Sequence, residues 1–533
     1  ISKLMANDVL TGVTVKVQPR SGFDKSRKNI FTTKVGTLTP MLTDLIIPNS
    51  DVNVKMAISA ALPPLASETF MRASFKVEAF FVPLRLLYGG FESWLTGSEL
   101  YNNNLPFRAE LPRLKVTSSH SLYFGPGSLL DYLGAQIGST SFSTNQTTIY
   151  LNVFPLVAYA RIYDDWYRNT KVQKPLFVQP GTMAVQNNIA AGVKLRSLPF
   201  CGYDQIYDLE PNSTFNDGSF LGQLRQRNYG VDYFTCATPQ AQFGSPMTFT
   251  PDALGNISIS AVRNANSMQI FEERQGLSGQ RIQDYCKANY GARLSSGVAQ
   301  RAIYLGSADY PVYSKGVYAN QGVTATNNPF TSVGARYGSA YASGTDFVVK
   351  AHFDEPGVFM ILGSLVPEAN YDRRISKHMS LFTQLGSLTD LPNPILQNVG
   401  NDTIEAFEVN ADVDMTAVIS PFGFVPRYTW AKTSINEVHG LLLSGQSLDS
   451  FVAKRLIGGS NPTIGNLFLK VNTTDLDNVT AVTAQLSSYG VWVDSYIQYY
   501  CSMPLARYSM PSLQDPAYEH GNSVHIPNNG SKL

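Results

Sequence analysis

The stretch FMRASFKVEAFFV, from Phe70 to Val82, carries the clearest structural signal in the chain. Its apolar and polar residues alternate, which is the period of a β-strand with one buried and one solvated face. The apolar positions are Met71, Ala73, Phe75, Val77, Ala79 and Phe81, and the polar positions are Arg72, Ser74, Lys76 and Glu78. At about 3.3 Å per residue this strand would run roughly 40 Å before Pro83 stops it, so a wide β-scaffold is expected.

Other alternating or wholly apolar stretches are spread along the chain and predict, with this one, roughly eight substantial strands. They are a short strand through Val13, Val15 and Val17, then Val52–Ile58, Phe70–Val82, Phe347–Phe353, Gly357–Val366, Phe407–Ile419, Asn466–Val471 and Val491–Cys501. Val52–Ile58 complements the opening strand and is expected to pair with it antiparallel. Gly357–Val366 is apolar on both faces, which predicts a central strand covered on both sides.

Helical spacing is confined to the connections between these strands. Helices are expected near Phe91–Leu95, Phe154–Asn169, Val262–Glu273 and Ser278–Asn289. In the last of them Ser278 would be the N-cap and Gly291 the stop. The neighbouring Asp164 and Asp165 would point about 100° apart on their helix, which favours a solvated helix end over a catalytic pair.

The composition leaves little charge for a water-facing surface. Charged residues make up 15% of the 533 residues, against about 25% in an average soluble protein, while aromatic residues reach 11%. Extensive subunit contact would explain this, because interface cores lose charge and gain aromatic residues. A loop-rich monomer that buries most of its own side chains is the other explanation.

The formal net charge of +1 indicates no overall basic surface, so any contact with nucleic acid must be local. The best candidate is the segment Arg20–Lys28, where Arg20, Lys25, Arg27 and Lys28 stand against one Asp. Its composition is typical of an arm that becomes ordered on contact. Two interpretations stay open, namely phosphate contact with a nucleic-acid backbone and a solvated loop.

Enzyme signatures are missing from the sequence. It contains no Gly-x-x-x-x-Gly-Lys-Ser/Thr, His-Glu-x-x-His, Gly-x-Ser-x-Gly or complete EF-hand pattern. His520 and His525, beside Glu519, lack further zinc ligands, so neither a metal nor a cofactor is expected. No apolar run approaches the roughly 18 residues of a membrane span, so membrane insertion is not expected. A glycosidase stays open, because its two carboxylates would meet only in space.

Dispersed strands that leave most of the chain in loops are rare in a compact enzyme. The pattern favours a mainly β fold, a double-sheet jelly roll with long loop insertions that contain a few helices, and virus capsid domains are one established use of this fold. We expect a single domain over residues 1–533, with elaborated connections at about 88–150, 170–345 and 425–460. Residues 503–533 would form an extended C-terminal strap.

Several segments, in order along most of the chain, resemble those of microvirus major capsid proteins, particularly the gokushovirus-like branch. They are VEAFFVPLRLLY (Val77–Tyr88) with Trp94 following, VDYFTCATPQ (Val231–Gln240), Glu272-Glu-Arg, GQRIQDY (Gly279–Tyr285) with Tyr304-Leu-Gly, VPEANYD (Val366–Asp372) with Arg374, and PFGFVPRYTW (Pro421–Trp430). The chain departs from the family pattern at Phe243–Ile257, which is short where many relatives insert a loop associated with a surface protrusion.

The resemblance implies an eight-stranded antiparallel viral jelly roll with long loop insertions. It implies a structural coat protein of a bacteriophage, without enzymatic activity. It implies a homo-oligomer, a T=1 icosahedral shell of sixty copies around circular single-stranded DNA, assembled in the bacterial host cytoplasm and ending in the virion. Further implied partners are a DNA pilot protein, a transient scaffolding protein and a host cell-surface receptor. The alternative is a β-sandwich carbohydrate-binding or carbohydrate-active surface protein, suggested by the aromatic content and the Asn/Ser/Thr-rich loops.

Candidate residues follow from this function. Tyr88, Trp94, Tyr496, Tyr499 and Tyr500 are expected to be buried between or within subunits. The four cations of the basic segment, Arg20, Lys25, Arg27 and Lys28, would face the packaged DNA. No catalytic residue is assigned.

Overall fold

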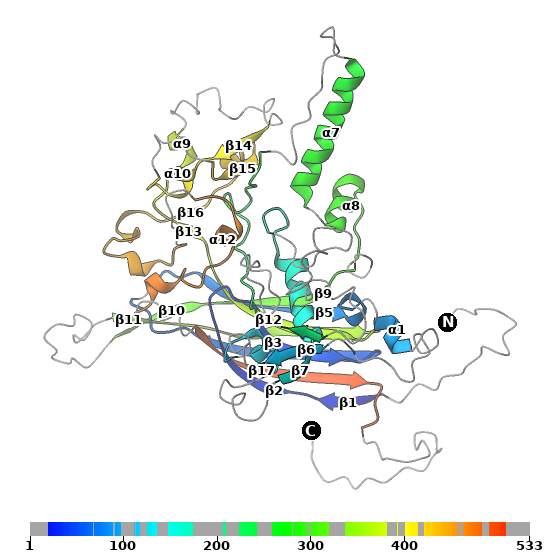
Figure 1. The fold of residues 1–533 in the computed structure, drawn as a ribbon. Coiled ribbons are helices and arrows are strands. Elements are labelled where there is room, and N and C mark those ends of the chain that lie inside the picture. The colour runs from blue at the N-terminus through cyan, green and yellow to red at the C-terminus, as the bar shows by residue number, and fades with distance from the viewer. Residues whose placement is uncertain are drawn as a thin grey trace, which may run out of the picture.

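The computed structural model places two antiparallel β-sheets face to face, with smaller elements gathered on one side of them (Figure 1). The structure describes residues 20–67, 69–88, 91–96, 111, 113–117, 125–135, 148–173, 206–208, 223–241, 258–279, 281–295, 298, 300–318, 336–380, 392, 400–413, 421–455, 457, 462–481 and 490–507. The expected strand through Val13–Val17 and most of the C-terminal strap lie outside these residues.

Ten strands make up the two facing sheets in this part of the chain. The six-stranded sheet has the order β1-β17-β4-β11-β10, with β2 also paired to β17, and contains β1 (Ser21–Asp24), β2 (Arg27–Thr33), β4 (Ser50–Ala61), β10 (Tyr313–Tyr318), β11 (Arg336–Phe353) and β17 (Val491–Met503). The four-stranded sheet has the order β3-β12-β5-β9 and contains β3 (Thr39–Ile46), β5 (Ala73–Pro83), β9 (Ile303–Pro311) and β12 (Gly357–Pro367).

The remaining elements belong to the connections. The helices are η1 (Leu84–Leu86), α1 (Phe91–Thr96), α4 (Leu129–Tyr132), α5 (Phe154–Ile162), the π-helical turn η4 (Tyr163–Tyr167), α7 (Ile259–Ser278), α8 (Ile282–Tyr290), α9 (Lys377–Ser380), α10 (Ala406–Val409), α11 (Thr429–Lys432), η10 (Gly440–Leu442), η11 (Asp449–Phe451), α12 (Asn466–Leu469) and η12 (Asp477–Val479). The short strands are β6 (Arg113–Thr117), β7 (Thr148–Asn152), β8 (Ile206–Asp208), β13 (Asn370–Tyr371), β14 (Asn401–Ile404), β15 (Gly423–Pro426) and β16 (Asn436–Glu437).

The opening strand is confirmed as β5, although it begins at Ala73 and includes Pro83. Its expected pairing with Val52–Ile58 is wrong, because β4 lies in the other sheet and β5 pairs with β12 and β9. Both strands have one apolar face, and the two faces meet across the sandwich instead of lying side by side. An alternating pattern shows that a face is buried, but not against which partner.

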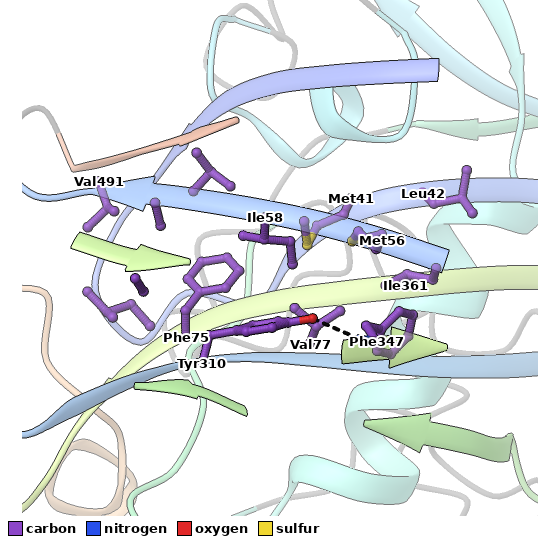
Figure 2. Close-up of a cluster of buried hydrophobic side chains, with 14 of the residues drawn as sticks. Met41, Leu42, Met56, Ile58, Phe75, Val77, Tyr310, Phe347, Ile361 and Val491 are labelled. Carbon is purple, nitrogen blue, oxygen red and sulfur yellow. Dashed lines mark hydrogen bonds between the residues drawn. The ribbon is translucent and has the colours of Figure 1, made fainter. Parts of the chain in front are cut away.

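The main core lies between the two sheets. Phe75, Ile58 and Ile361 are among its buried side chains and come from β5, β4 and β12 (Figure 2). In Figure 2 the hydroxyl of Tyr310 reaches Phe347, whose backbone N–H donates to it at 3.0 Å. This hydrogen bond satisfies a backbone group at the irregularity of β11 between Gly344 and Phe347.

A second core covers the outer face of the four-stranded sheet. α5 packs there on β5 and β12, against side chains such as Phe80, Val82 and Met360. This cover explains why the alternation of β5 ends at Ala79 and why every residue of β12 except Val366 is buried. The prediction of a central strand at Gly357–Val366 is therefore confirmed.

Two expected strands are wrong. In place of a strand at Phe407–Ile419, residues Ala406–Val409 form the helical turn α10, whose capping box joins Glu405 and Glu408. The carboxylate of Glu408 then binds Lys377 at 2.9 Å inside the protein, so its alternate position does not mark a solvated face. Residues 414–420 lie outside the described part. Likewise, the expected strand Asn466–Val471 contains the helical turn α12.

The helices differ from expectation mainly at their ends. The predicted Phe154–Asn169 is α-helical only to Ile162 and continues as the π-helical turn η4. Ser278 is the last residue of α7 and not the N-cap of α8, whose N-cap is Arg281. Gly291 does end α8, in the left-handed conformation at φ 67° that glycine adopts without strain.

Candidate subunit and nucleic-acid interfaces

The outer face of the six-stranded sheet carries large aromatic side chains. Each is about half exposed: Trp492, Tyr496 and Tyr500 on β17, Tyr341 on β11 and Tyr313 on β10, with exposed fractions between 46% and 55%. The strict alternation of β17 puts its three outward while the intervening residues enter the core. Aromatic residues at such positions are typical of surfaces that contact a partner.

The strand register arranges these aromatic residues in rows. Trp492 stands opposite Ala61, Ala61 opposite Tyr341, and Tyr341 opposite Tyr313, so one row crosses four strands. The rings of Tyr313 and Tyr341 have their centroids 6.3 Å apart. The row therefore presents three large aromatic side chains on the outer face, with the small Ala61 between Trp492 and Tyr341.

The predicted basic arm is already ordered as β1 and β2 on the edge of β17, and its cations are divided. Arg20 binds Asp51, Lys25 binds Asp44, and Lys28 lies 3.0 Å from Asp494. Arg27 is exposed and makes no ion pair with the described residues. Partly exposed ion pairs of this kind contribute little to stability, so the three paired cations remain able to exchange partners.

Lys25 takes part in a contact between the two sheets. Its ammonium lies 5.0 Å from the centre of the Tyr499 ring, and the Tyr499 hydroxyl donates to the same Asp44 at 2.5 Å. Asp44 comes from β3, so this group links the two sheets. Burial is the main cause that raises the pKa of Tyr499.

Two of the five predicted interface residues lie inside this chain. Tyr499 is 2% exposed in the main core and Tyr88 is 1% exposed in the second core, so neither offers a surface to a neighbouring subunit. Their aromatic character alone did not distinguish core from interface. Trp94 is partly exposed and stacks on Phe91 at 6.0 Å, whereas Tyr496 and Tyr500 lie on the open outer face.

The polar face of β5 is occupied by the chain itself. Glu78 binds Arg227 at 2.6 Å and accepts a hydrogen bond from Tyr167, whose pKa burial raises well above its usual value. Lys76 lies 2.9 Å from Asp309 on β9. These side chains therefore join the insertions to the sheet.

The expected solvated helix end at Asp164 and Asp165 is wrong. Their side chains are only 13% and 8% exposed, and they bind Arg168 at 2.6 Å and Arg161 at 3.0 Å. Asp165 also accepts the backbone N–H of Ala302 at 3.0 Å. The π-helical turn directs both carboxylates toward arginines, which a regular helix pattern did not predict.

An ionic group that sequence reasoning missed lies at one end of the open face. The two ring nitrogens of His352 lie 2.7 Å from Asp51 and 3.0 Å from Asp354, and Asp51 also binds Arg20. The hydrogen bond to Asp51 is the main cause that raises the pKa of His352. The alternation of Val348, Lys350 and His352 along β11 was a signal that His352 lies on the outer face. It did not reveal the ion pairs, because Asp51 and Arg20 come from a distant part of the chain.

The long helix α7 stands away from the sandwich (Figure 1). Among the α7 side chains whose exposure the structure describes, none is buried. The exposed apolar ones are Ile259, Val262, Met268, Ile270 and Phe271. Its contact with its own chain includes Phe271 against Tyr285 of α8, with ring centroids 6.4 Å apart. Helices in proteins gain most of their stability by packing an apolar face against another surface, so these exposed apolar residues favour a covering partner.

Within the described residues, no three His, Cys, Asp or Glu side chains are gathered in a way that would hold a metal ion. Among the helices there, none combines the length and hydrophobicity needed to cross a membrane.

Comparison with known protein families decides the class of the molecule. The family model described as capsid protein (F protein) matches residues 12–252 and 216–513. The chain belongs to this phage capsid protein family. It is a structural major capsid protein of the microvirus type and a component of the virion. Neither the family model nor these relatives support the carbohydrate-binding alternative that the sequence pattern left open.

Individual relatives extend the match over nearly the whole capsid protein. It is 23% identical to capsid protein VP1 of Chlamydia phage 1, over 93% of this chain and 96% of that protein. It is 21% identical to capsid protein VP1 of Bdellovibrio phage phiMH2K, over 85% of this chain and 88% of that protein. A coat protein assembles with other subunits, and such contacts would explain an exposed apolar surface such as that of α7.

Proposed function

We propose that this capsid protein is the non-enzymatic subunit of a T=1 icosahedral shell of sixty copies that encloses circular single-stranded DNA. The single observation that carries the proposal is the family match, which extends over most of the chain. The chain would form one domain with insertions at about 88–150, 170–345 and 425–460, and residues 503–533 would strap across this subunit or a neighbour.

The winding of the sandwich supports a jelly roll. Successive strands β3, β4 and β5 alternate between the two sheets, and each pairs antiparallel with a strand of a later segment, β12, β11 and β9 respectively. Two chain segments that wind together in opposite directions are the defining feature of this fold. The eight strands would be β3, β4, β5, β9, β10, β11, β12 and β17, with β1 and β2 added to the edge of β17.

The two sides of the sandwich suggest how the subunit is oriented. α7, α8 and the two-stranded sheets β13-β16 and β14-β15 lie beyond the four-stranded sheet (Figure 1), while the outer face of the six-stranded sheet carries half-exposed aromatic side chains in the described part of the chain. We place the open face toward the packaged DNA, with Arg20, Arg27 and Lys28 as phosphate contacts at its edge and Lys25 as a weaker one. Loops on the other side would meet the host receptor, in keeping with the general role of insertions in recognition.

Assembly partners follow from the resemblance. A DNA pilot protein and a transient scaffolding protein would act with the coat during assembly in the host cytoplasm. Trp94 and the apolar residues of α7 are the proposed contacts between subunits, because both are accessible on the isolated chain.

The shell is tested by producing the full chain, with its scaffolding partner if required, and by examining it by sedimentation and electron microscopy. Closed isometric particles with sixty subunits are the expected result. A stable monomer under every assembly condition, or an open tube, would contradict the proposal.

The DNA contact is tested by measuring affinity for an oligonucleotide against salt concentration. Replacing Arg20, Lys25, Arg27 and Lys28 together by Gln should weaken binding and lower the salt dependence by roughly 0.7 per lost phosphate contact. The matched control replaces four exposed cations on the insertion side, Arg263, Arg274, Arg293 and Lys432. If the two quadruple variants weaken binding equally, the assignment of the DNA contact to the four cations of the basic segment is wrong.

A further inference from the structure

A cavity of about 960 Å³ opens on the outer face of the six-stranded sheet, across β1, β17, β4 and β11. Its floor consists of two neighbouring cross-strand rows of side chains, and Arg507, just after β17, lines it as well. The first row is Asp24, Tyr500, Asn53 and Lys350, and the second row is Gly22, Ser502, Asp51 and His352.

Charge is unevenly distributed across this cavity. Asp51 is held between Arg20 and His352, so its carboxylate is already neutralised. Lys350 and Arg507 make no ion pair with any described residue. Since strands are about 4.8 Å apart, Lys350 lies on the order of 14 Å from the backbone of Asp24, at the opposite end of the row. An anion is therefore favoured on the Lys350 side.

The middle of the row offers groups suited to a base. Tyr500 is 50% exposed and presents its ring on the open face. Next to it, the side-chain oxygen of Asn53 is shielded by its neighbours and has no hydrogen-bond partner in the described structure. Such an oxygen lacks the partner that a buried polar atom normally has, and a ligand amino group would supply it once the Asn53 amide turns toward the cavity.

We propose that this cavity binds nucleotides of single-stranded DNA, with a base stacked on Tyr500, its edge at Asn53 and the neighbouring phosphate at Lys350 and Arg507. An aromatic platform beside unpaired cations is the combination that single-stranded nucleic acid requires. The volume exceeds that of one nucleotide, so it accommodates a short run of the strand. This site rests on the proposed function, because it needs the open face to meet the packaged DNA.

The first experiment measures the affinity of the purified full-length chain for a fluorescent eight-nucleotide deoxyadenylate. Tyr500→Ala should weaken binding roughly 5- to 100-fold, in line with the usual contribution of stacking. Lys350→Gln should weaken it less and reduce the salt dependence by about one phosphate contact. The control is Tyr313→Ala on β10, which removes an equally exposed tyrosine from the same sheet face outside the cavity.

An abasic oligomer of the same length separates stacking from phosphate contact. The native chain should bind the abasic oligomer more weakly than the deoxyadenylate. The native chain and Tyr500→Ala should bind the abasic oligomer with the same affinity. A second, independent readout is photocross-linking with 5-iododeoxyuridine, which should attach the strand to Tyr500 of the native protein. Thermal melting followed by circular dichroism establishes that each variant is folded.

The outcomes separate this site from the broader proposal. If the native chain shows salt-dependent binding that Tyr500→Ala and Lys350→Gln leave unchanged, or that Tyr313→Ala weakens equally, the cavity is not the site while the DNA contact stands. If the native chain binds no oligonucleotide, both are overturned, whereas the shell is judged separately from particle images. If Tyr500→Ala abolishes particle formation without changing DNA affinity, the cavity is a subunit contact and the inference is wrong.

Discussion

At the scale of single residues, buried charges connect the insertions to the sandwich. Arg455 is 5% exposed, and its guanidinium lies 3.9 Å from the centre of the Phe468 ring and 4.4 Å from that of Tyr229. It also donates to the hydroxyl of Tyr371 at 2.8 Å, which in turn donates to Asp232. A planar cation is required here, because the same group stacks on rings and donates hydrogen bonds at its edge.

We predict that Arg455→Lys destabilises the chain by about 1–3 kcal/mol, since an ammonium does not reproduce these stacked contacts. Urea denaturation of the two proteins measures the difference. Arg263→Lys on the exposed surface of α7 is the control and should change stability by less than about 0.5 kcal/mol. Equal stability of Arg455→Lys and the native protein would show that the stacking has no energetic role.

His352 is predicted to titrate above its ordinary pKa of about 6.5, because Asp51 and Asp354 favour its charged form. The protonated ring then stabilises the fold. This contribution is fully present below about pH 6.5 and is lost as the pH rises through the higher folded-state pKa. NMR titration of labelled histidine should show the raised value.

Substitutions at two carboxylates test the cause of this shift. Asp51→Asn should return the pKa of His352 toward its ordinary value, whereas Asp412→Asn, which removes a carboxylate bound to Arg373, should leave it unchanged. A pKa of His352 that is the same in Asp51→Asn and in the native protein would refute this cause.

At the scale of elements, close backbone approaches decide where strands lie. Gly338 on β11 exchanges two backbone hydrogen bonds with Leu65, at 2.9 and 3.2 Å, where the connection to β5 crosses the end of the sheet. A Cβ atom added to Gly338 would lie 2.1 Å from the backbone oxygen of Ser67. Backbone atoms are unable to move aside as a flexible side chain does, so glycine is required here for space.

Gly338→Ala is predicted to lower the free energy of unfolding by about 3 kcal/mol, at the upper end of the usual cost of overpacking. Thermal or urea denaturation measures this loss. Gly22→Ala on β1 is the matched control, because its Cβ would have no neighbour within 4 Å in the same sheet. Similar losses in both variants would mean that strand propensity and not the close approach is responsible.

At the scale of the whole molecule, the two faces of the sandwich have different roles. The four-stranded sheet is covered by α5 and its neighbours, while the outer face of the six-stranded sheet carries half-exposed aromatic side chains among the described residues. The projecting α7 adds exposed apolar side chains in the described part of the chain. Contacts between subunits would bury the apolar residues of α7 when the shell closes, which agrees with the low proportion of charged residues.

We predict that Met268→Asp in α7 leaves the monomer folded but prevents closed particles, because a buried and unpaired carboxylate would cost several kcal/mol at each subunit contact. Asn264→Asp adds the same charge to an exposed polar position of the same helix and should assemble normally. Electron microscopy and sedimentation provide the measurement. Normal particles from Met268→Asp would exclude α7 from the contact.

The sequence by itself determined the elements whose pattern is local. Alternation located β4, β5 and β17, the doubly apolar run located β12, and Gly291 marked the end of α8. The ordered motifs also identified the family, which the family model confirms. Each of these depends on residues that lie close together in the chain.

Only the tertiary structure decided which surfaces meet. Alternation at Phe407–Ile419 resembled a strand, yet the capping box and the distant Lys377 hold Glu408 inside a helical turn. Tyr499 and Tyr500 are chain neighbours with opposite surroundings, because the pleat of β17 turns one into the core and the other onto the open face. The rows that line the cavity combine four strands from distant parts of the chain, and a linear pattern holds no information about that register.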